Sequence, residues 1–452
     1  MKQTLPLLAL LCLYLTQMKA QDWLPVSVGE IVNEYVFTSI SVVDENVAWT
    51  AASYWDVPPV PEDHVIKIFR TTDGGQTWAI KDLTDESLTG RMTWEIHALD
   101  SLTAWISSNR LEATDTRPLF KTTNGGGSWT QVDLPNMGGG VMIHFFDPVN
   151  GLAIRNNLIT ITTDGGTSWQ PVTVPGWSSD ERAIFWGCPN NHTAYFGSHV
   201  WSGTNKGRVF HSADRGLTWT AIQVGATNEN INSIAFTDTL HGVAIITDAG
   251  GSPYPTAKVF ETFDGGQTWE QAATPPFGSI SSIAAVPGAP NAFVAGNLLS
   301  GDLVIAHNLQ GIADSTWVYD ESLFFYSNGF EFFSPTVGYS IGYYEDGTNV
   351  ILKWNGDLTP PSAAREPILK NIAVQSFPSP FSEALTVQVD FEKPTSGSLE
   401  ILDFSGRQVF FQNIENQQVW NKNIAAHGWT PGAYLLKVRT AEGVAIRKIF
   451  KQ

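Results

Sequence analysis

The sequence predicts an all-β protein in which a seven-bladed β-propeller is followed by a small C-terminal β-sandwich. A tryptophan-bearing turn recurs at separations of 40 to 51 residues, a pair of apolar strands lies between its copies, and both patterns stop near residue 358. The composition agrees, because 40 glycines, 25 phenylalanines and 17 tryptophans in 452 residues are typical of many short strands joined by tight turns.

The turn motif first appears at residues 71–78 and reads TTDGGQTW. Its acidic side chain can accept hydrogen bonds from the turn backbone, its glycines permit positive φ angles, and the threonine before the tryptophan can bond back across the turn. We expect each tryptophan to be buried between neighbouring blades. Five clear copies carry these roles through the pairs Asp73 and Trp78, Asn124 and Trp129, Asp164 and Trp169, Asp214 and Trp219, and Asp264 and Trp269.

A second motif, two apolar strands joined by a short turn, alternates with the first. Its seven copies begin near residues 38, 93, 142, 183, 232, 281 and 328. Each copy and the hairpin that follows give about four strands per repeat of 40–50 residues, which is typical of a propeller blade. The seventh unit lacks a fourth strand. Because Trp23–Val26 resembles Trp169–Val172, we expect the N-terminal strand to complete the last blade.

The chain divides into four predicted segments. Residues 1–20 have the features of a secretory signal peptide, with Lys2 before an apolar run and Ala20 at the expected cleavage site. The propeller is expected over 21–358, a linker over 359–366 and a second domain of about seven short strands over 367–452. No later segment has the apolar length of a transmembrane helix, so none is expected in the mature chain.

Charge and cysteine content exclude several function classes. The formal net charge is −18, which opposes binding to nucleic acid. After removal of the signal peptide only Cys188 remains, so neither an internal disulfide nor a cysteine zinc site can form. No metal or cofactor motif is present, and we expect neither a metal nor a cofactor.

The turn motif closely resembles the Asp-box, also called the BNR repeat, with Asn124, Ser128 and Ser168 as mild departures. Asp-boxes occur in sialidases, sortilin-like receptors, other glycoside hydrolases and the photosystem assembly-factor family. In those folds they lie on the outer part of the ring, away from the central funnel. The resemblance therefore implies a propeller whose repeated turns are structural rather than catalytic.

The C-terminal segment resembles the sorting domain of the type IX (Por) secretion system of Bacteroidetes-type bacteria. The matching stretches are FPSPF at 377–381, LEILDFSGRQV at 399–409, WTPGAYLLKV at 429–438 and RKIFK at 447–451. The resemblance implies export by Sec, then passage by the type IX machinery to the cell surface or the medium. The motif residues are Pro378, Pro380, Phe381, Gly406, Gly432, Tyr434 and Lys448.

Long loops between the second and third strands of a blade should open on the face opposite the repeated turns. They and one loop between blades place aromatic rings beside charged groups, a pattern that suits binding of a glycan or an extracellular protein. The sequence therefore predicts a non-catalytic binding propeller with no catalytic residues. The candidate ligand-binding residues are Trp55, Asp56, Trp177, Asp180, Arg182, Trp201 and Tyr254.

A glycoside hydrolase, sialidase-like or other, with carboxylates in the central funnel is the alternative. Such enzymes need two carboxylates, and the candidates are Asp56, Glu95, Asp180 and Glu345, but nothing in the sequence selects a pair. The arginine triad of a sialidase cannot be assembled. We expect the scattered histidines to be packed or solvent-facing rather than ligands, as at His64, His97 and His144.

Overall fold

The computed structural model describes two compact units, Met1–Pro360 and Pro361–Gln452. The described residues contain no α-helix. The predicted signal peptide, Cys188 and most of the predicted linker lie outside the described residues. The described residues are 23–28, 35–54, 64–85, 87–109, 119–134, 137, 140–183, 191–248, 257–272, 282–290, 292–296, 305–308, 318–319, 325–344, 346–359, 372–378, 380–402, 408–430, 432–440 and 443–452.

In the first unit, the described strands form seven four-stranded antiparallel sheets, numbered 1 to 7 here in chain order. The inner strands are β2 (Tyr35–Val42), β6 (Met92–Ala98), β10 (Met142–Phe145), β14 (Thr193–Phe196), β18 (Glu229–Phe236), β22 (Ser282–Ala285) and β26 (Phe325–Ser334). The second strands are β3 (Ala48–Tyr54), β7 (Ala104–Asn109), β11 (Gly151–Arg155), β15 (His199–Gly203), β19 (Gly242–Asp248), β23 (Phe293–Gly296) and β27 (Val337–Tyr344).

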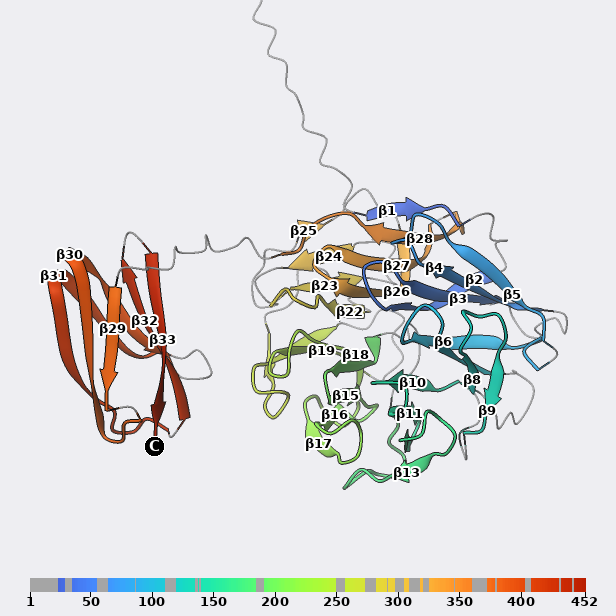
Figure 1. The fold of residues 1–452 in the computed structure, drawn as a ribbon. Helices are drawn as coiled ribbons and strands as arrows, with labels where there is room; N and C mark the ends of the chain where they lie inside the picture. The colour runs from blue at the N-terminus through green and yellow to red at the C-terminus, as the bar shows by residue number, and fades with distance from the viewer. Residues whose placement is uncertain are drawn as a thin grey trace, which may run out of the picture. The chain divides into compact units, whose positions relative to one another are not determined.

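The outer half of each sheet follows the same order. The third strands are β4 (Ile66–Thr71), β8 (Leu119–Thr122), β12 (Leu158–Thr162), β16 (Arg208–Ser212), β20 (Lys258–Thr262), β24 (Ile305–Asn308) and β28 (Asn349–Trp354). The outermost strands are β5 (Ala79–Leu83), β9 (Thr130–Val132), β13 (Gln170–Val172), β17 (Thr220–Gln223), β21 (Glu270–Gln271), β25 (Val318–Tyr319) and, from the start of the chain, β1 (Trp23–Val26). The inner strands of neighbouring sheets lie against one another, so the sheets surround a common centre (Figure 1).

The N-terminal strand completes the last sheet, as the sequence predicted. β1 pairs antiparallel with β28, and Trp23 lies opposite Trp354. The Trp23 ring is buried and meets Phe332 and Trp354 edge to face, with centroids 5.8 and 5.2 Å away. The two ends of the ring are therefore joined by backbone hydrogen bonds and by an aromatic cluster, which leaves β28 without a free edge.

The repeated turns have the predicted hydrogen bonds. In the first copy the Asp73 carboxylate accepts bonds from the Thr77 backbone N–H (2.9 Å), the Thr77 hydroxyl (2.6 Å) and the Thr71 hydroxyl (2.8 Å). Gly74 and Gly75 both have positive φ angles. In the fourth copy Arg215 takes the position of the first glycine with a φ of 62°, a conformation that favours glycine.

The tryptophan of each clear repeat packs against the preceding sheet. Trp169 shares a hydrophobic cluster with Trp105 of β7, and Trp219 shares one with Leu152 of β11. Trp269 lies in the cluster of Trp201 on β15. These rings fill the space between neighbouring sheets, as expected for a tryptophan at the end of the turn that follows the third strand.

The prediction for sheet 4 was wrong, because it began the apolar strand pair near residue 183 and assigned Trp201 to a loop. The inner strand is β14, and a turn of two residues joins it to the second strand β15, which contains Trp201. The corresponding turn joining β6 to β7 has five residues, Leu99 to Thr103. The turn between β14 and β15 is three residues shorter than the turn between β6 and β7. The apolar pattern alone therefore placed the strands of sheet 4 at the wrong residues.

The second unit contains one hydrogen-bonded sheet of five strands in its described residues. They are β29 (Ile372–Phe377), β30 (Ala384–Leu402), β31 (Gln408–Ala425), β32 (Gly432–Thr440) and β33 (Gly443–Lys451). The sequence predicted about seven short strands, but β30 and β31 are long and each replaces two of them. The first half of β30 pairs with β29 and its second half pairs with β32, while β31 follows it throughout.

Candidate functional site

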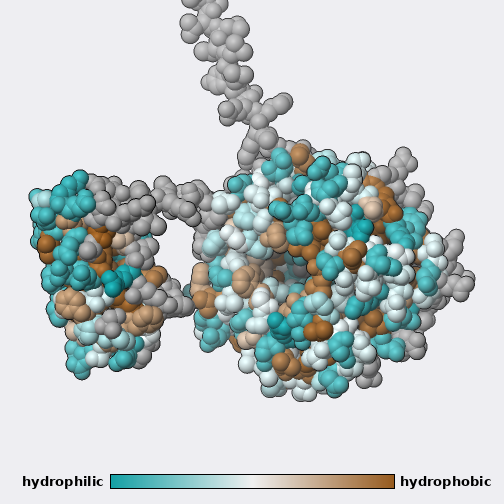
Figure 2. Space-filling view, viewed as in Figure 1, coloured by the Kyte–Doolittle hydropathy of each residue, from teal (hydrophilic) through white to brown (hydrophobic). Residues whose placement is uncertain are grey.

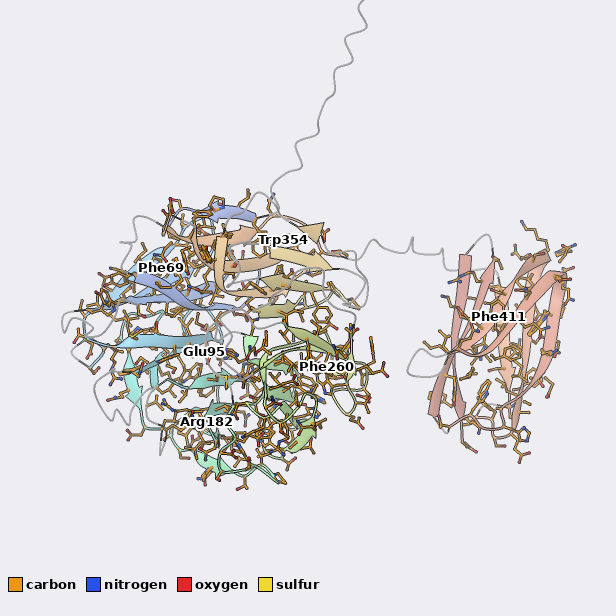
Figure 3. The ribbon with its side chains drawn as sticks, turned by 180° about the vertical axis from the view of Figure 1, so that it is seen from behind. Phe69, Glu95, Arg182, Phe260, Trp354 and Phe411 are labelled. Atoms are coloured by element: carbon orange, nitrogen blue, oxygen red, sulfur yellow. The ribbon has the colours of Figure 1, made fainter. Side chains whose placement is uncertain are left out.

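The predicted loop face is only partly within the described residues. Trp55, Asp56 and Tyr254 lie outside them. Asp180 and Arg182 are exposed on the segment that leads from β13 to β14. Figure 3 shows Arg182 away from the middle of the ring. The structure thus supports an exposed polar surface at these two residues.

Two ion pairs hold this segment to the hairpin that precedes β16. The Asp180 carboxylate lies 2.6 Å from Lys206 Nζ. The buried Glu181 carboxylate pairs with Arg208, whose Nε donates to Oε1 at 2.9 Å. Hydrogen bonding from Lys206 lowers the pKa of Asp180. The Asp180 carboxylate is therefore ionised near neutral pH, and both ion pairs tie this segment to the hairpin.

The two described tryptophans of the predicted site are not free rings. Trp177 is half-buried, meets Phe210 at a centroid distance of 4.8 Å, and donates from Nε1 to the Glu181 carbonyl oxygen. Trp201 is 0% exposed and stacks on Phe236, 3.7 Å between centroids. The expectation that Trp201 is an exposed ring for a ligand was wrong, because Trp201 belongs to β15 rather than to a loop.

A cavity of about 250 Å³ lies at the centre of the ring. It is lined by the inner strands of all seven sheets. Figure 2 shows the hollow on the face in view, and Figure 3 shows Glu95 near the middle of the ring. Each inner strand contributes one residue at an equivalent position near its first turn: Ser41, His97, His144, Ala194, Ala235, Ala284 and Glu331.

Two glutamates from different sheets face this cavity. Glu95 on β6 accepts a hydrogen bond at Oε2 from the Ile143 N–H of sheet 3, at 2.7 Å. Glu331 on β26 accepts one at Oε2 from the Val42 N–H of sheet 1, at 3.1 Å. Each carboxyl group thus joins its own sheet to the next. Burial raises the pKa of Glu331 to about 8 and raises the pKa of Glu95 well above its usual range.

The other large polar groups of the cavity are two histidines and a tyrosine. His144 stacks on Tyr195 with centroids 3.8 Å apart, and its ring lies 4.6 Å from that of His97. Burial lowers the pKa of His97 to about 4 and lowers the pKa of His144 well below its usual range. Both rings are therefore uncharged near neutral pH. Within the described part of the chain, the buried Tyr195 hydroxyl has no hydrogen-bond partner.

The cavity lies toward the repeated turns rather than toward the predicted loop face. Its equivalent residues come just before the first turn of each sheet, and that turn lies beside the repeated turn of the same sheet: Gly125 N–H donates to the Leu102 carbonyl oxygen at 2.9 Å. At the other end of the inner strands, Asn191 Nδ2 donates to the Ile283 carbonyl oxygen and Asn191 Oδ1 accepts from Ser282, two sheets away. These bonds link sheet 4 directly to sheet 6 at that end of the ring.

Sequence reasoning named Glu95, His97 and His144 only as scattered candidates and missed Glu331 and Tyr195. His64 is packed, since its Nε2 accepts from the Tyr54 N–H, and Glu345 lies outside the described residues. The available signal was a repeat-by-repeat alignment of the inner strands, which would have placed His97, His144 and Glu331 in one column.

The described residues of the sorting motif lie in the core, on the strands or at the surface of the second unit. Phe381 and Tyr434 are buried in its hydrophobic cluster, and the Tyr434 hydroxyl donates to the Thr430 carbonyl oxygen at 2.6 Å. Pro378 and Pro380 are exposed, and Gly432 begins β32. Lys448 lies on β33, whereas Gly406 falls outside the described residues.

Residues 375–452 match a family model described as the secretion system C-terminal sorting domain. The match indicates export by type IX secretion to the cell surface or the extracellular space. We find no helix among the described residues with the length and hydropathy needed to cross a membrane.

Two curated proteins resemble this chain at low identity. The photosystem II assembly lipoprotein Ycf48 of Synechococcus sp. strain CC9902 is 26% identical over 162 residues, which are 34% of this chain and 43% of that protein. The xyloglucanase Xgh74A of Acetivibrio thermocellus is 25% identical over 296 residues, 55% of this chain and 34% of the enzyme. The chain thus spans well under half the length of the curated relatives it matches.

Solved structures show the same type of fold. The structure described as YCF48 bound to D1 peptide aligns with a TM-score of 0.52 and 18% identity, over 74% of this chain and 97% of that one. YCF48 from Cyanidioschyzon merolae aligns with a TM-score of 0.52 and 16% identity, over 74% and 98% of the two chains. These likenesses support a propeller-like arrangement of the four-stranded sheets.

Proposed function

We propose that this chain is a secreted or cell-surface binding propeller without catalytic activity, whose ligand is a glycan or an extracellular protein. The seven four-stranded sheets are interpreted as seven blades, the repeated turns as Asp-boxes, and the C-terminal unit as a β-sandwich that carries the sorting signal. Residues 1–20 are interpreted as a signal peptide and 359–366 as a linker between the two domains.

The proposal rests on one observation: the carboxyl groups near both candidate sites are bonded to other groups of the fold. Asp180 pairs with Lys206, and Glu181 with Arg208. Glu95 and Glu331 accept backbone N–H groups from the next blade. A hydrolase needs two carboxyl groups directed at the scissile bond, whereas each of these four has at least one oxygen bonded within the fold. One related propeller is described as bound to a peptide, which supports a binding role.

A glycoside hydrolase remains the second candidate, because Glu95 and Glu331 line one cavity and one relative is a xyloglucanase. A carboxyl group whose pKa is raised by burial suits a general acid. In this interpretation the two glutamates would be the acid and its partner carboxylate.

A glycan array and a hydrolysis assay on the purified chain separate the two candidates. The binding function predicts retention of specific glycans or extracellular proteins and no turnover of oligosaccharides, including xyloglucan fragments. Turnover that is abolished by Glu331→Gln or Glu95→Gln would overturn the non-catalytic interpretation. For the loop face, Arg182→Ala and Asp180→Ala should weaken binding, while Lys422→Ala on the exposed surface of the sorting domain should not.

A further inference from the structure

The central cavity has an unusual charge balance. Among its described lining residues, Glu95 and Glu331 are the acids, and no lysine or arginine lines it. The two carboxyl groups raise each other's cost of ionisation, because Glu331 contributes electrostatically to the raised pKa of Glu95. Burial thus makes the ionised form of both groups costly, and a cationic ligand in the cavity would offset that cost.

The hydrogen bonds leave one side of each carboxyl group for a ligand. In both glutamates Oε2 is the atom that accepts the backbone N–H from the next blade. Nearby, the stacked rings of His144 and Tyr195 present aromatic surface to the cavity. Carboxylate oxygens together with aromatic rings favour an organic cation.

Other ligand classes fit less well. An anion would meet two acids and uncharged histidines. Within the described part of the chain, no group of three histidine, cysteine, aspartate or glutamate side chains could hold a metal ion. A volume of about 250 Å³ lies below the usual range for drug-sized ligands, roughly 300–1,000 Å³, and suits a single side chain rather than an oligosaccharide.

Apolar residues occur at one position of the first turn in three blades. Leu102, Val149 and Leu240 each follow a cavity residue by five positions and are 53, 48 and 47% exposed. Their N–H groups donate to the side chains of Asp100, Asp147 and Asp238, and their carbonyl oxygens accept from the glycine of the adjacent repeated turn. The turns therefore hold these side chains outward on the face toward which the cavity lies.

We propose that the central cavity binds the ammonium group of a lysine side chain, presented by a polypeptide partner that lies across the turns of Leu102, Val149 and Leu240. The proposal rests on the proposed binding function and names its ligand as a peptide with lysine between apolar residues. The ammonium group would pair with Glu331 and Glu95, and the neighbouring apolar residues would cover the three turns.

Calorimetry on the purified full chain at pH 8 tests this proposal with a short capped peptide in which one lysine is flanked by leucines. We expect binding at least tenfold tighter than for the same peptide with norleucine or acetyl-lysine at the centre. Glu331→Gln and Glu95→Gln should each weaken binding at least tenfold, and both retain an oxygen for the backbone N–H. Glu270→Gln on the exposed strand β21 is the control and should bind normally.

A double variant, Leu102→Ser with Leu240→Ser, separates the cavity from the turns. It should weaken the leucine-flanked peptide but not capped lysine alone. Equal binding of the lysine and norleucine peptides, or no binding of either, would overturn the proposal. If spermidine or glucosamine binds as tightly as the peptide and the leucine variant has no effect, the partner is not a polypeptide. Glycan or protein binding that survives both glutamine variants would leave the binding function intact and refute only this site.

Discussion

At the scale of single residues, one side chain organises each repeated turn. The Asp264 carboxylate accepts hydrogen bonds from the Thr268 N–H (2.9 Å), the Thr268 hydroxyl (2.6 Å) and the Thr262 hydroxyl (2.9 Å). In the second copy Asn124 makes the corresponding bonds, since its Oδ1 accepts from the Ser128 N–H and its Nδ2 donates to the Ser128 hydroxyl. The turn therefore requires an acceptor oxygen at this position and does not require a charge.

We predict that Asp264→Ala lowers the free energy of unfolding by about 1–3 kcal/mol, because three donors lose their acceptor. Asp264→Asn should cost less than half as much, since asparagine already works in the second copy. Urea unfolding of the first unit followed by tryptophan fluorescence measures both. Equal losses for the two variants would show that the charge, rather than the acceptor geometry, stabilises the turn.

Acid should weaken the turns that carry aspartate. Hydrogen bonds from Thr77 lower the pKa of Asp73 to about 2, and those from Ser168 do the same for Asp164. A carboxyl group whose folded pKa is depressed stabilises the fold above its unfolded pKa, near 4, and loses that contribution as the pH falls toward 2. The melting temperature should fall over this range, and less steeply in the double variant Asp73→Asn with Asp164→Asn. If the melting temperature of the double variant fell as steeply with pH as that of the unaltered protein, these two aspartates would not be the source of the acid sensitivity.

Residue types at the turns were predictable because their chemistry is local. The aspartate, glycines and threonine of each copy lie within eight residues and satisfy one another. The cavity residues were not predictable in the same way, since Glu331 and Tyr195 carry no motif and meet only when distant strands close into a ring. Trp201 was misassigned for a different reason. Its polar neighbours indicated a loop, whereas a two-residue turn ends at residue 198 and Trp201 lies on the next strand, β15.

At the scale of strands, the last sheet is assembled from both ends of the first unit. Its outer strand β1 comes from the N-terminal end of that unit, and Trp23 packs in the cluster of Phe330, Phe332 and Trp354. This closure was predictable because Trp23–Val26 matches the segment after each repeated tryptophan. The strand count of the second unit was not, because β30 continues through Pro394 and Gly397, two residue types that usually interrupt strands.

We predict that Trp23→Ala lowers the free energy of unfolding by about 3–5 kcal/mol, because a fully buried aromatic ring is lost at the closing contact. Leu24→Ala on the same strand should cost less than about 1 kcal/mol, since Leu24 is 41% exposed. Chemical unfolding and limited proteolysis at the N-terminus compare the two. Similar losses for both variants would show that β1 does not close the ring through its buried tryptophan.

At the scale of the whole molecule, the sorting domain and the seven four-stranded sheets belong to separate units. The contacts divide the chain at Pro360, and the match to the sorting domain begins at residue 375. The hydrophobic cluster of the second unit, which includes Phe381, Trp420 and Tyr434, contains no residue of the first. The sorting unit can therefore be removed without opening the core of the propeller.

We predict that a chain lacking residues 366–452 folds as a propeller but accumulates in the periplasm of its native host, because it loses the segment that the type IX machinery recognises. Cell fractionation with immunoblotting measures its location, and the melting temperature of the purified fragment confirms its fold. A full-length variant with Phe381→Ser, which disrupts the core of the second unit, should show the same retention. A matched substitution at the exposed Lys422 should reach the surface normally. Surface delivery of the truncated chain would contradict the sorting assignment while leaving the binding site in the propeller to be tested on its own.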